Sequence, residues 1–357
     1  VIGVIAYLLP AMTGIPLAIL IAVLYAVLTH YLFGAYDVWL PASTPLLVQF
    51  PTAIFFGLVG QYVVERRRSK QISEAIGYYL PEDVARNLTS GTPDPGKINK
   101  VVYSTCLATD MAGFSTMAEK MGPGELANLL NDYFDSLSAP LKSNHVDITE
   151  FRADAIMCAW TAESPQVSVR RNALLASLQA ADAFALFKQR NPIYEGGLRI
   201  GLEAGMVHVG HSGGGGSFVY SIVGDCANTA SRVEGLNKHI GTQVLATEAV
   251  VEGFENLLLR EVGKFQFVGK SECVGIVEVV SKFELASPAQ ITLCERFAEA
   301  MACYRKTDWR KAQRLFEDVL QSYVNDGPAQ FYWHQCQKYL DGEPVLEEPG
   351  VIRMSKK

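Results

Sequence analysis

The sequence predicts an α+β fold, with membrane-spanning helices before it and a small helical tail after it. The first 64 residues are apolar and almost uncharged. From Val101 onward, strand-like segments alternate with helix-like ones in a mixed order, which favours one sheet with helices on one face. Beyond residue 284 only helical periodicity remains. We therefore expect four parts: transmembrane helices (1–64), a linker (65–98), a sheet domain (99–283) and a helical extension (284–357).

Composition excludes several classes of protein. The chain has 357 residues, enough for about two domains. Its formal net charge of −6 does not indicate a nucleic-acid binder, so we expect no nucleic-acid partner. The seven cysteines are scattered, without a CxxC pair or a nearby His at zinc-ligand spacing. This pattern argues against a zinc site or a disulfide framework and for reduced thiols in a cytosolic portion.

Two continuous apolar runs, Ile15–Phe33 and Thr44–Val64, are each long enough to cross about 30 Å of hydrocarbon. Val1–Leu9 is expected to be the end of a third span. The basic cluster in Glu65–Lys70 directly follows a span and therefore belongs on the cytoplasmic side. We expect a multi-pass protein in contact with membrane lipid, with its sheet domain in the cytoplasm and an extracytoplasmic domain before Val1.

The linker is expected to hold two short helices, Gln71–Leu80 and Pro81–Leu88, and then a turn-rich break over Ser90–Gly96. A helix that leaves a membrane and leads to a sheet can transmit motion. It can equally be a passive spacer, and the sequence leaves both open.

The stretch Val101–Ser115 is the centre of the predicted sheet domain. It reads as a buried strand that ends at Asp110 and continues into a small-residue turn that opens a helix. A carboxylate there can bind a hard cation, and the N–H groups of the turn can bind phosphate oxygens. An Asp at a strand end is, however, more often only a cap or a turn residue.

A second carboxylate is expected at the tip of a hairpin, because Asp154 lies between two short strand patterns. The other expected elements are helices over 123–137, 167–187 and 225–237, a strand–turn–strand over 198–210, and strands over 146–151, 155–160, 218–223, 243–246 and 266–280. The glycine run Gly213–Gly216 either bends tightly or flexes.

These elements place candidate catalytic groups together. Asp110 and Asp154 side by side would suit two Mg²⁺ or Mn²⁺ ions during phosphoryl transfer. Asn228 and Arg232 are four residues apart and so share one helix face. Together they could hold a ribose oxygen and the charge of a pentavalent phosphate. For this pair alone, an ordinary polar helix face is the competing interpretation.

Three segments closely resemble the blocks of class III nucleotidyl cyclases: VVYSTCLATDMAGFSTMAEKM, EFRADAIMCAW and YSIVGDCANTASRVEG. The resemblance covers about Val101–Phe283. It implies a ferredoxin-like catalytic domain that makes a 3′,5′-cyclic nucleotide and pyrophosphate, uses two Mg²⁺ or Mn²⁺ ions and forms homodimers with composite sites. The spans and linker resemble receptor-type bacterial cyclases with a CHASE2-type sensor, which implies the inner membrane.

The resemblance also implies roles for single residues. Asp110 and Asp154 look like the metal ligands, Asn228 like the ribose-orienting residue and Arg232 like the transition-state arginine. The triphosphate would contact Phe114 and Ser115 in the turn and Lys270, although Val268 occupies one common lysine position.

The base-reading positions of the family fall on Glu150 and Ser221. A carboxylate accepts hydrogen bonds from guanine N1–H and N2–H₂ and would repel adenine N1, so GTP is favoured over ATP. Adenylate cyclase activity is the first alternative, and a degenerate dimeric relay is the second. Ala153 stands where the family usually has Gly, which predicts strain if that position needs a positive φ.

The tail is expected to form three helices, marked by apolar residues at helical spacing. Trp309, Ala312 and Phe316 resemble a tetratricopeptide-type helical hairpin. So small a unit cannot bury much core alone, so we expect it to pack on the sheet domain or its partner. Gly350–Lys357 is expected to be a loose end.

Overall fold

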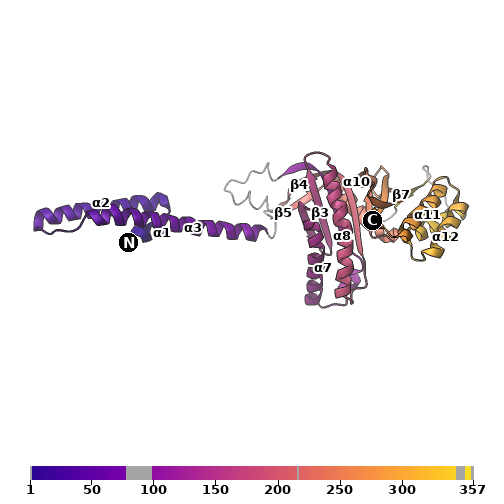
Figure 1. Cartoon of the computed structure of the whole chain (residues 1–357), viewed down its shortest axis with the longest axis horizontal. Helices are drawn as coiled ribbons and strands as arrows, with labels where there is room; N and C mark the ends of the chain where they lie inside the picture. The colour runs from indigo at the N-terminus through magenta and orange to yellow at the C-terminus, as the bar shows by residue number, and fades with distance from the viewer. Residues whose placement is uncertain (1, 78–98, 215–216, 343–349, 355–357) are drawn as a thin grey trace. The chain divides into compact units, whose positions relative to one another are not determined.

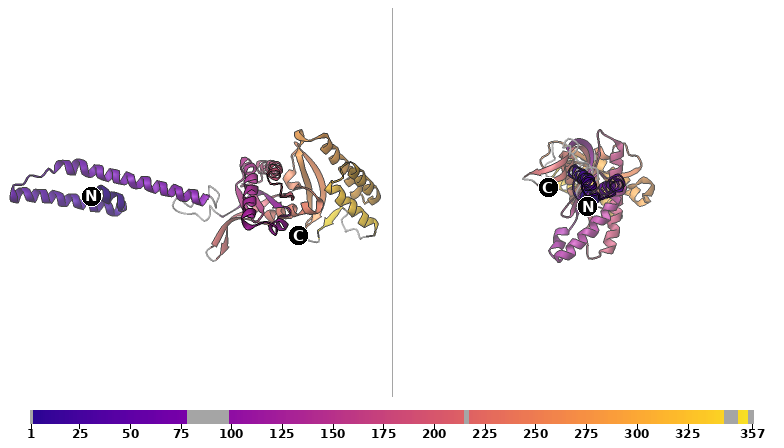
Figure 2. Two further views of the ribbon diagram at one scale, coloured as in Figure 1. Left: turned by 90° about the horizontal axis from the view of Figure 1, so that it is seen from below. Right: turned by 90° about the vertical axis from the view of Figure 1, so that its left-hand side faces the viewer.

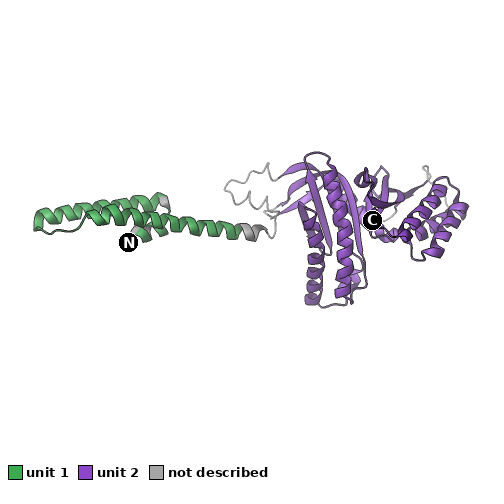
Figure 3. Cartoon of the chain, in the orientation of Figure 1, with its two compact units in different colours: residues 1–94 green, residues 95–357 purple. Residues whose placement is uncertain are grey.

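The computed structural model describes residues 2–77, 99–214, 217–342 and 350–354. The chain divides into two compact units, 1–94 and 95–357, which we describe separately (Figure 3). The sheet domain expected over 99–283 and the helical extension expected over 284–357 fall in the same unit.

The first unit is helical. It contains α1 (Ile2–Leu8), α2 (Ala11–Tyr36), a π-helical segment (Pro45–Gln49) and α3 (Phe50–Gly77). Two stretches, Met12–Tyr36 and Pro45–Ile72, are long and apolar enough to cross a membrane by length and composition. The seven residues of α1 are too few for a further candidate span.

Helix α3 runs without a break through the basic cluster to Gly77, so the first expected linker helix is its continuation. The second expected linker helix and the turn-rich break lie outside the described residues. Helices α1 and α3 approach closely at Gly57, where an added Cβ would lie 2.6 Å from Cβ of Ala6. Glycine is therefore required at this helix crossing.

The second unit is built on a nine-stranded sheet with the order β2-β3-β1-β4-β6-β8-β7-β9, and β5 also pairs with β4 (Figure 1). The predicted α+β sheet is confirmed. The strands are β1 (Lys100–Met111), β2 (Ile148–Arg152), β3 (Ala155–Ala162), β4 (Leu198–Gly214), β5 (Ser217–Val223), β6 (Val244–Thr247), β7 (Leu257–Gln266), β8 (Val274–Lys282) and β9 (Val351–Arg353).

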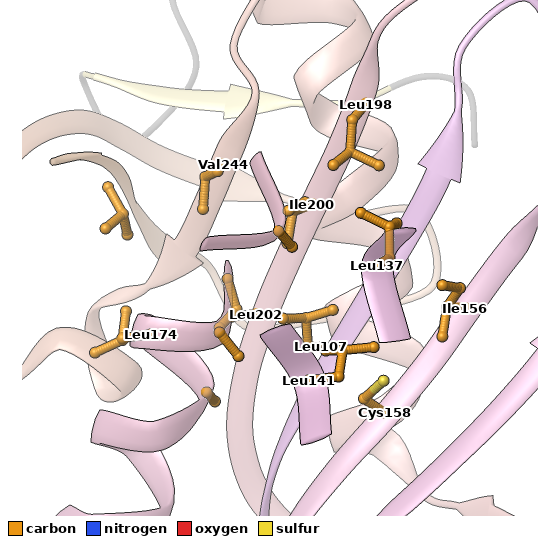
Figure 4. Close-up of a cluster of buried hydrophobic side chains, with 14 of the residues drawn as sticks. Leu107, Leu137, Leu141, Ile156, Cys158, Leu174, Leu198, Ile200, Leu202 and Val244 are labelled. Atoms are coloured by element: carbon orange, nitrogen blue, oxygen red, sulfur yellow. The ribbon is translucent and has the colours of Figure 1, made fainter. Parts of the chain in front are cut away.

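Helices cover both faces of this sheet, whereas the sequence predicted helices on one face. They are α6 (Phe114–Ala118), α7 (Pro123–Ser143), α8 (Val167–Arg190), α9 (Asp225–Ile240), α10 (Glu248–Val251), α11 (Pro288–Arg305), α12 (Trp309–Ser322) and α13 (Gly327–Leu340). Neighbouring residues of β6 show the two faces. Val244 packs in a core with α7 and α8 (Figure 4), whereas Leu245 packs in a second core with α9 and the tail helices.

Strand β4 is one continuous strand of 17 residues, so the turn predicted within residues 198–210 is wrong. Its glycines suggested a turn, but two of them instead allow other parts of the chain to approach the strand closely. A Cβ on Gly201 would lie 2.1 Å from the backbone nitrogen of Glu234, and one on Gly210 would lie 2.1 Å from Asn99 Oδ1. Gly201 therefore allows α9 to lie directly on the sheet.

Helix α11 packs against β7, helix α13 packs against α9, and α12 packs against α11 and α13. Figure 2 shows these tail helices in orange to yellow at the end of the unit. Each begins at a side-chain cap, Ser287, Asp308 and Asp326 respectively. Their core contains Phe297, Phe316 and Tyr332. The expected packing of the tail on the sheet domain is thus present, and its likeness to a tetratricopeptide hairpin stays a prediction.

The C-terminal residues are not a loose end, and that prediction is wrong. Val351–Arg353 form β9, which pairs in parallel with β7, and both Val351 and Ile352 are buried. Strand β7 was also missed, because the strand predicted over 266–280 overlaps β8 and reaches only the last residue of β7. Two buried apolar residues give too short a signal to recognise a strand such as β9.

Candidate active site

The two predicted metal carboxylates are brought together. Asp110 lies near the C-terminal end of β1, and Asp154 lies in the tight turn between β2 and β3, where Thr109 pairs with Ile156. Burial raises the pKa of Asp154, and the negative charge of Asp110 adds to this effect, while Arg199 lowers it. Two carboxylates that repel each other in this way form a site that a cation would stabilise.

The turn that carries Asp154 contains Ala153 with φ of 52°, in the left-handed region. The strain expected from an alanine at the usual glycine position is therefore present. A left-handed conformation costs a residue with a Cβ about 1–2 kcal/mol.

We expect Ala153→Gly to raise the free energy of unfolding by about 0.5–1 kcal/mol, because the relieved strain exceeds the extra backbone entropy of glycine in the unfolded chain. Thermal unfolding of the purified chain measures this. Ala155→Gly, two residues away in β3, is the matched control and should lower stability. An equal loss of stability in both variants would contradict the strain at Ala153.

The turn after β1 leads into α6, whose first residues are Phe114 and Ser115. The segment that precedes β4 holds this turn in place. The backbone N–H of Ala112 donates to the carbonyl of Gly197 at 2.8 Å, and the Tyr194 hydroxyl donates to the carbonyl of Ala112 at 2.6 Å. The predicted phosphate-binding turn is thus held beside Asp110 by hydrogen bonds to the backbone of Ala112.

Asn228 and Arg232 both lie on α9 and line one cavity of about 390 Å³. The Arg232 guanidinium donates to the backbone carbonyl of Val268, in the loop after β7. Met354, which follows β9, lines the same cavity. The C-terminal segment therefore reaches the surroundings of the predicted transition-state arginine, which the sequence did not indicate.

Lys270 also approaches α9. Its Nζ donates to Asp225 Oδ2 at 2.8 Å and to Thr229 Oγ1 at 2.5 Å. Asp225 begins α9, and Thr229 directly follows Asn228. The structure therefore places Lys270 against the first turns of α9, the helix that carries Asn228, even though Val268 occupies a common lysine position of the family.

The two predicted base-reading positions also meet. Glu150 Oε1 accepts a hydrogen bond of 2.6 Å from the backbone N–H of Ile222, the residue after Ser221. Glu150 Oε2 accepts from Arg152, at 3.0 Å from Nε and 2.5 Å from Nη2. The sequence did not indicate the pairing with Arg152. Alternation along β2 places residues two apart on the same face, but many such pairs do not touch.

A pair of residues beside Asp110 was missed. Arg199 on β4 pairs across from Asp110, and its Nη1 lies 3.3 Å from Asp110 Oδ2 and 3.9 Å from Glu234 Oε1. Burial raises the pKa of Glu234 to about 8, and the charge of Asp110 contributes. The pKa of Glu234 therefore depends on what neutralises Asp110. Only the register of β1 on β4 could have shown this cluster.

The donor set fits divalent cations of the Mg²⁺ type, which prefer carboxylate oxygens. Over the described ranges, no three His, Cys, Asp or Glu side chains are grouped closely enough to hold an ion by themselves. Asp110 and Asp154 would therefore hold such ions together with oxygens from outside the chain, which water or phosphate can provide.

Helix α9 turns its functional side chains in opposite directions. Residues two apart on an α-helix point about 200° apart. Glu234 faces Arg199 and the carboxylate pair, whereas Arg232 reaches Val268 on the other side. Within one chain, Arg232 therefore points away from Asp110 and Asp154.

Comparisons with known proteins identify the family of the sheet domain. Residues 99–280 match the family described as "Adenylate and Guanylate cyclase catalytic domain". Adenylate cyclase 1 of Rhizobium meliloti (strain 1021) is 28% identical over 217 residues, which cover 60% of this chain and 33% of the relative. Human retinal guanylyl cyclase 1 is 34% identical over 160 residues, which cover 43% of this chain and 14% of the relative.

This chain thus spans a third or less of the length of these two relatives. The structure of a bacterial light-regulated adenylyl cyclase superimposes with a TM-score of 0.52 at 20% identity, covering 65% of this chain and 66% of that one. At this identity the likeness concerns the fold. The curated relatives include both adenylate and guanylate cyclases, so they do not decide between the two substrates.

Proposed function

The chain belongs to the adenylate and guanylate cyclase family, and on this premise we propose that it converts GTP into 3′,5′-cyclic GMP and pyrophosphate. In this proposal two copies of the chain form two composite sites. One copy supplies Asp110 and Asp154, and the other supplies Asn228 and Arg232.

The observation that carries the composite site is the direction of Arg232. The side chain leaves α9 on the side opposite the carboxylate pair of its own chain. It therefore needs a second chain to meet a substrate held by carboxylates. A homodimer related by a twofold axis supplies this arrangement twice.

The residues have separate roles in the proposed reaction. Asp110 and Asp154 would hold two divalent cations. When bound, such cations lower the pKa of the ribose 3′-hydroxyl and neutralise part of the negative charge of the triphosphate. The turn at Phe114 and Ser115 would position phosphate oxygens. Asn228 would orient the ribose, and Arg232 would stabilise the charge that develops on the α-phosphate.

Glu150 supports GTP as the substrate. Its Oε1 accepts from Ile222 and has a second lone pair for a guanine N–H, whereas Oε2 accepts twice from Arg152, so a second guanine N–H would have to displace one of these two bonds. Adenine N1 is a hydrogen-bond acceptor, so its lone pair would face the carboxylate of Glu150 and repel it. A buried polar group without its partner costs about 1–3 kcal/mol. Production of cyclic AMP from ATP is the alternative function.

The test of substrate choice is product formation by the purified protein with Mn²⁺, with GTP and ATP offered separately. We expect the wild type to make cyclic GMP. Glu150→Lys with Ser221→Asp should shift the ratio of kcat/KM for GTP over ATP toward ATP by at least about tenfold, which corresponds to about 1.4 kcal/mol.

The matched control is Glu163→Lys, which makes the same charge change at an exposed position just after β3. It should leave the ratio unchanged. Cyclic AMP from the wild type would overturn the role of Glu150 and leave the cyclase activity standing. Nucleotide binding without any product would favour the degenerate relay, against which the presence of Asp110, Asp154, Asn228 and Arg232 argues.

We also propose that residues 1–77 anchor the enzyme in the cell inner membrane as a multi-pass segment. Two candidate spans and their exposed apolar side chains, such as Leu24 and Phe56, support this. The basic cluster in α3 supports a cytoplasmic catalytic domain. The resemblance to receptor-type cyclases supports a CHASE2-type sensor as the source of the signal.

A further inference from the structure

Arg199 lies between two carboxylates of different kinds. Asp110, 3.3 Å from its Nη1, is a proposed metal ligand. Glu234, 3.9 Å from the same atom, belongs to α9 and has no role in the proposed reaction. Because an arginine stays protonated at all relevant pH values, its charge competes with any cation that approaches Asp110.

Glu234 lies close to Arg199 because its helix packs directly on the sheet. Its backbone lies against Gly201 of β4, where no Cβ intervenes. Its Oε1 atom is buried and makes no hydrogen bond to any residue in the described part of the chain. A buried acceptor without a donor costs free energy, so a hydrogen bond from a nearby donor to this oxygen would be stabilising.

We propose that Glu234 is a positioning residue that receives the Arg199 guanidinium when a divalent cation occupies Asp110. This inference rests on the proposed function, because it takes Asp110 as a metal ligand. The movement is small, since the same nitrogen of Arg199 already lies near both carboxylates. Arg199 thereby leaves the metal site without becoming a buried, unpaired charge.

The proposal predicts that Glu234 affects metal affinity only through Arg199. Glu234→Gln keeps the size of the side chain but cannot take up a negative charge when a cation neutralises Asp110, so Arg199 stays on Asp110. We expect the Kd for Mn²⁺ to rise about fivefold to tenfold. Arg199→Gln removes the competing charge, and in that background Glu234→Gln should leave the Kd unchanged within about twofold, because coupled residues are non-additive.

The experiment titrates Mn²⁺ alone into the full chain in detergent and measures the free ion by electron paramagnetic resonance. It compares the wild type, both single variants and the double variant. Glu255→Gln, at an exposed position, is the control for a lost carboxylate and should bind as the wild type does. Should Arg199→Gln fail to fold, Arg199→Lys serves instead, and with it the effect of Glu234→Gln should persist.

The outcomes separate this inference from the proposed function. An equal rise in Kd from Glu234→Gln with and without Arg199 would overturn the positioning role, as would no rise in either background. Absence of Mn²⁺ binding in the wild type, and in Asp110→Asn alike, would overturn the metal site itself and the inference with it.

Discussion

Asp154→Asn is expected to lower the rate of cyclic nucleotide formation by about 10³-fold. The neutral amide removes one of the two carboxylates on which the metal site depends, and loss of about 4 kcal/mol of transition-state stabilisation gives this factor. The effect is measured as kcat/KM with Mn²⁺. Thermal unfolding should show a folded protein, because the neutral amide avoids both the burial of a charge and the repulsion from Asp110 that raise the pKa of Asp154.

The same variant tests the composite site. Arg232→Ala alone should also be inactive, but an equal mixture with Asp154→Asn should recover about a quarter of wild-type activity. Half of the randomly formed dimers then contain one of each chain, and each such dimer has one intact site. Asp110→Asn mixed with Asp154→Asn is the control and should stay inactive. Failure of the first mixture to recover activity would place both sets of residues in one chain.

The second large effect concerns stability. Arg260 of β7 is only 5% exposed and lies between Glu278, at 2.6 Å from its Nε, and Asp326, at 2.6 Å from its Nη1. Its guanidinium also stacks 5.0 Å from the ring centre of Phe297. Removal of one partner from such a buried network costs about 3–5 kcal/mol. We expect Asp326→Ala to lower the free energy of unfolding by this amount in denaturant titrations.

Asp308→Ala is the matched control. Both aspartates cap the N-terminus of a tail helix, with Asp326 accepting from Ala329 and Asp308 from Lys311. Asp308, however, is exposed and forms no ion pair with any residue that the structure describes. Loss of a cap alone costs about 1 kcal/mol. Equal losses in the two variants would show that the Arg260 network contributes little beyond capping.

The sequence predicted most elements of the catalytic sheet, because their signals are local. Asp154 at a hairpin tip and the helix that carries Asn228 and Arg232 follow from short patterns of apolar residues and turns. The left-handed Ala153 followed from its resemblance to a glycine position. The resemblance likewise assigned base reading to both Glu150 and Ser221. It did not predict that Glu150 accepts a hydrogen bond from the backbone of β5.

The features that were missed depend on contacts distant in the sequence. The glycines of β4 resemble turn residues until α9 is placed against Gly201. Arg199 looks like an ordinary strand residue until the register of β1 on β4 sets it opposite Asp110. Strand β9 depends on an open edge of β7, which no local pattern reveals.

That C-terminal strand also affects how copies of the chain can meet. An open strand edge invites pairing with a neighbouring molecule, and short edge strands are one way to discourage it. With only three residues, β9 covers part of β7 and offers a poor template for another strand. Neighbouring copies of the chain are then discouraged from joining edge to edge into larger sheets through β7.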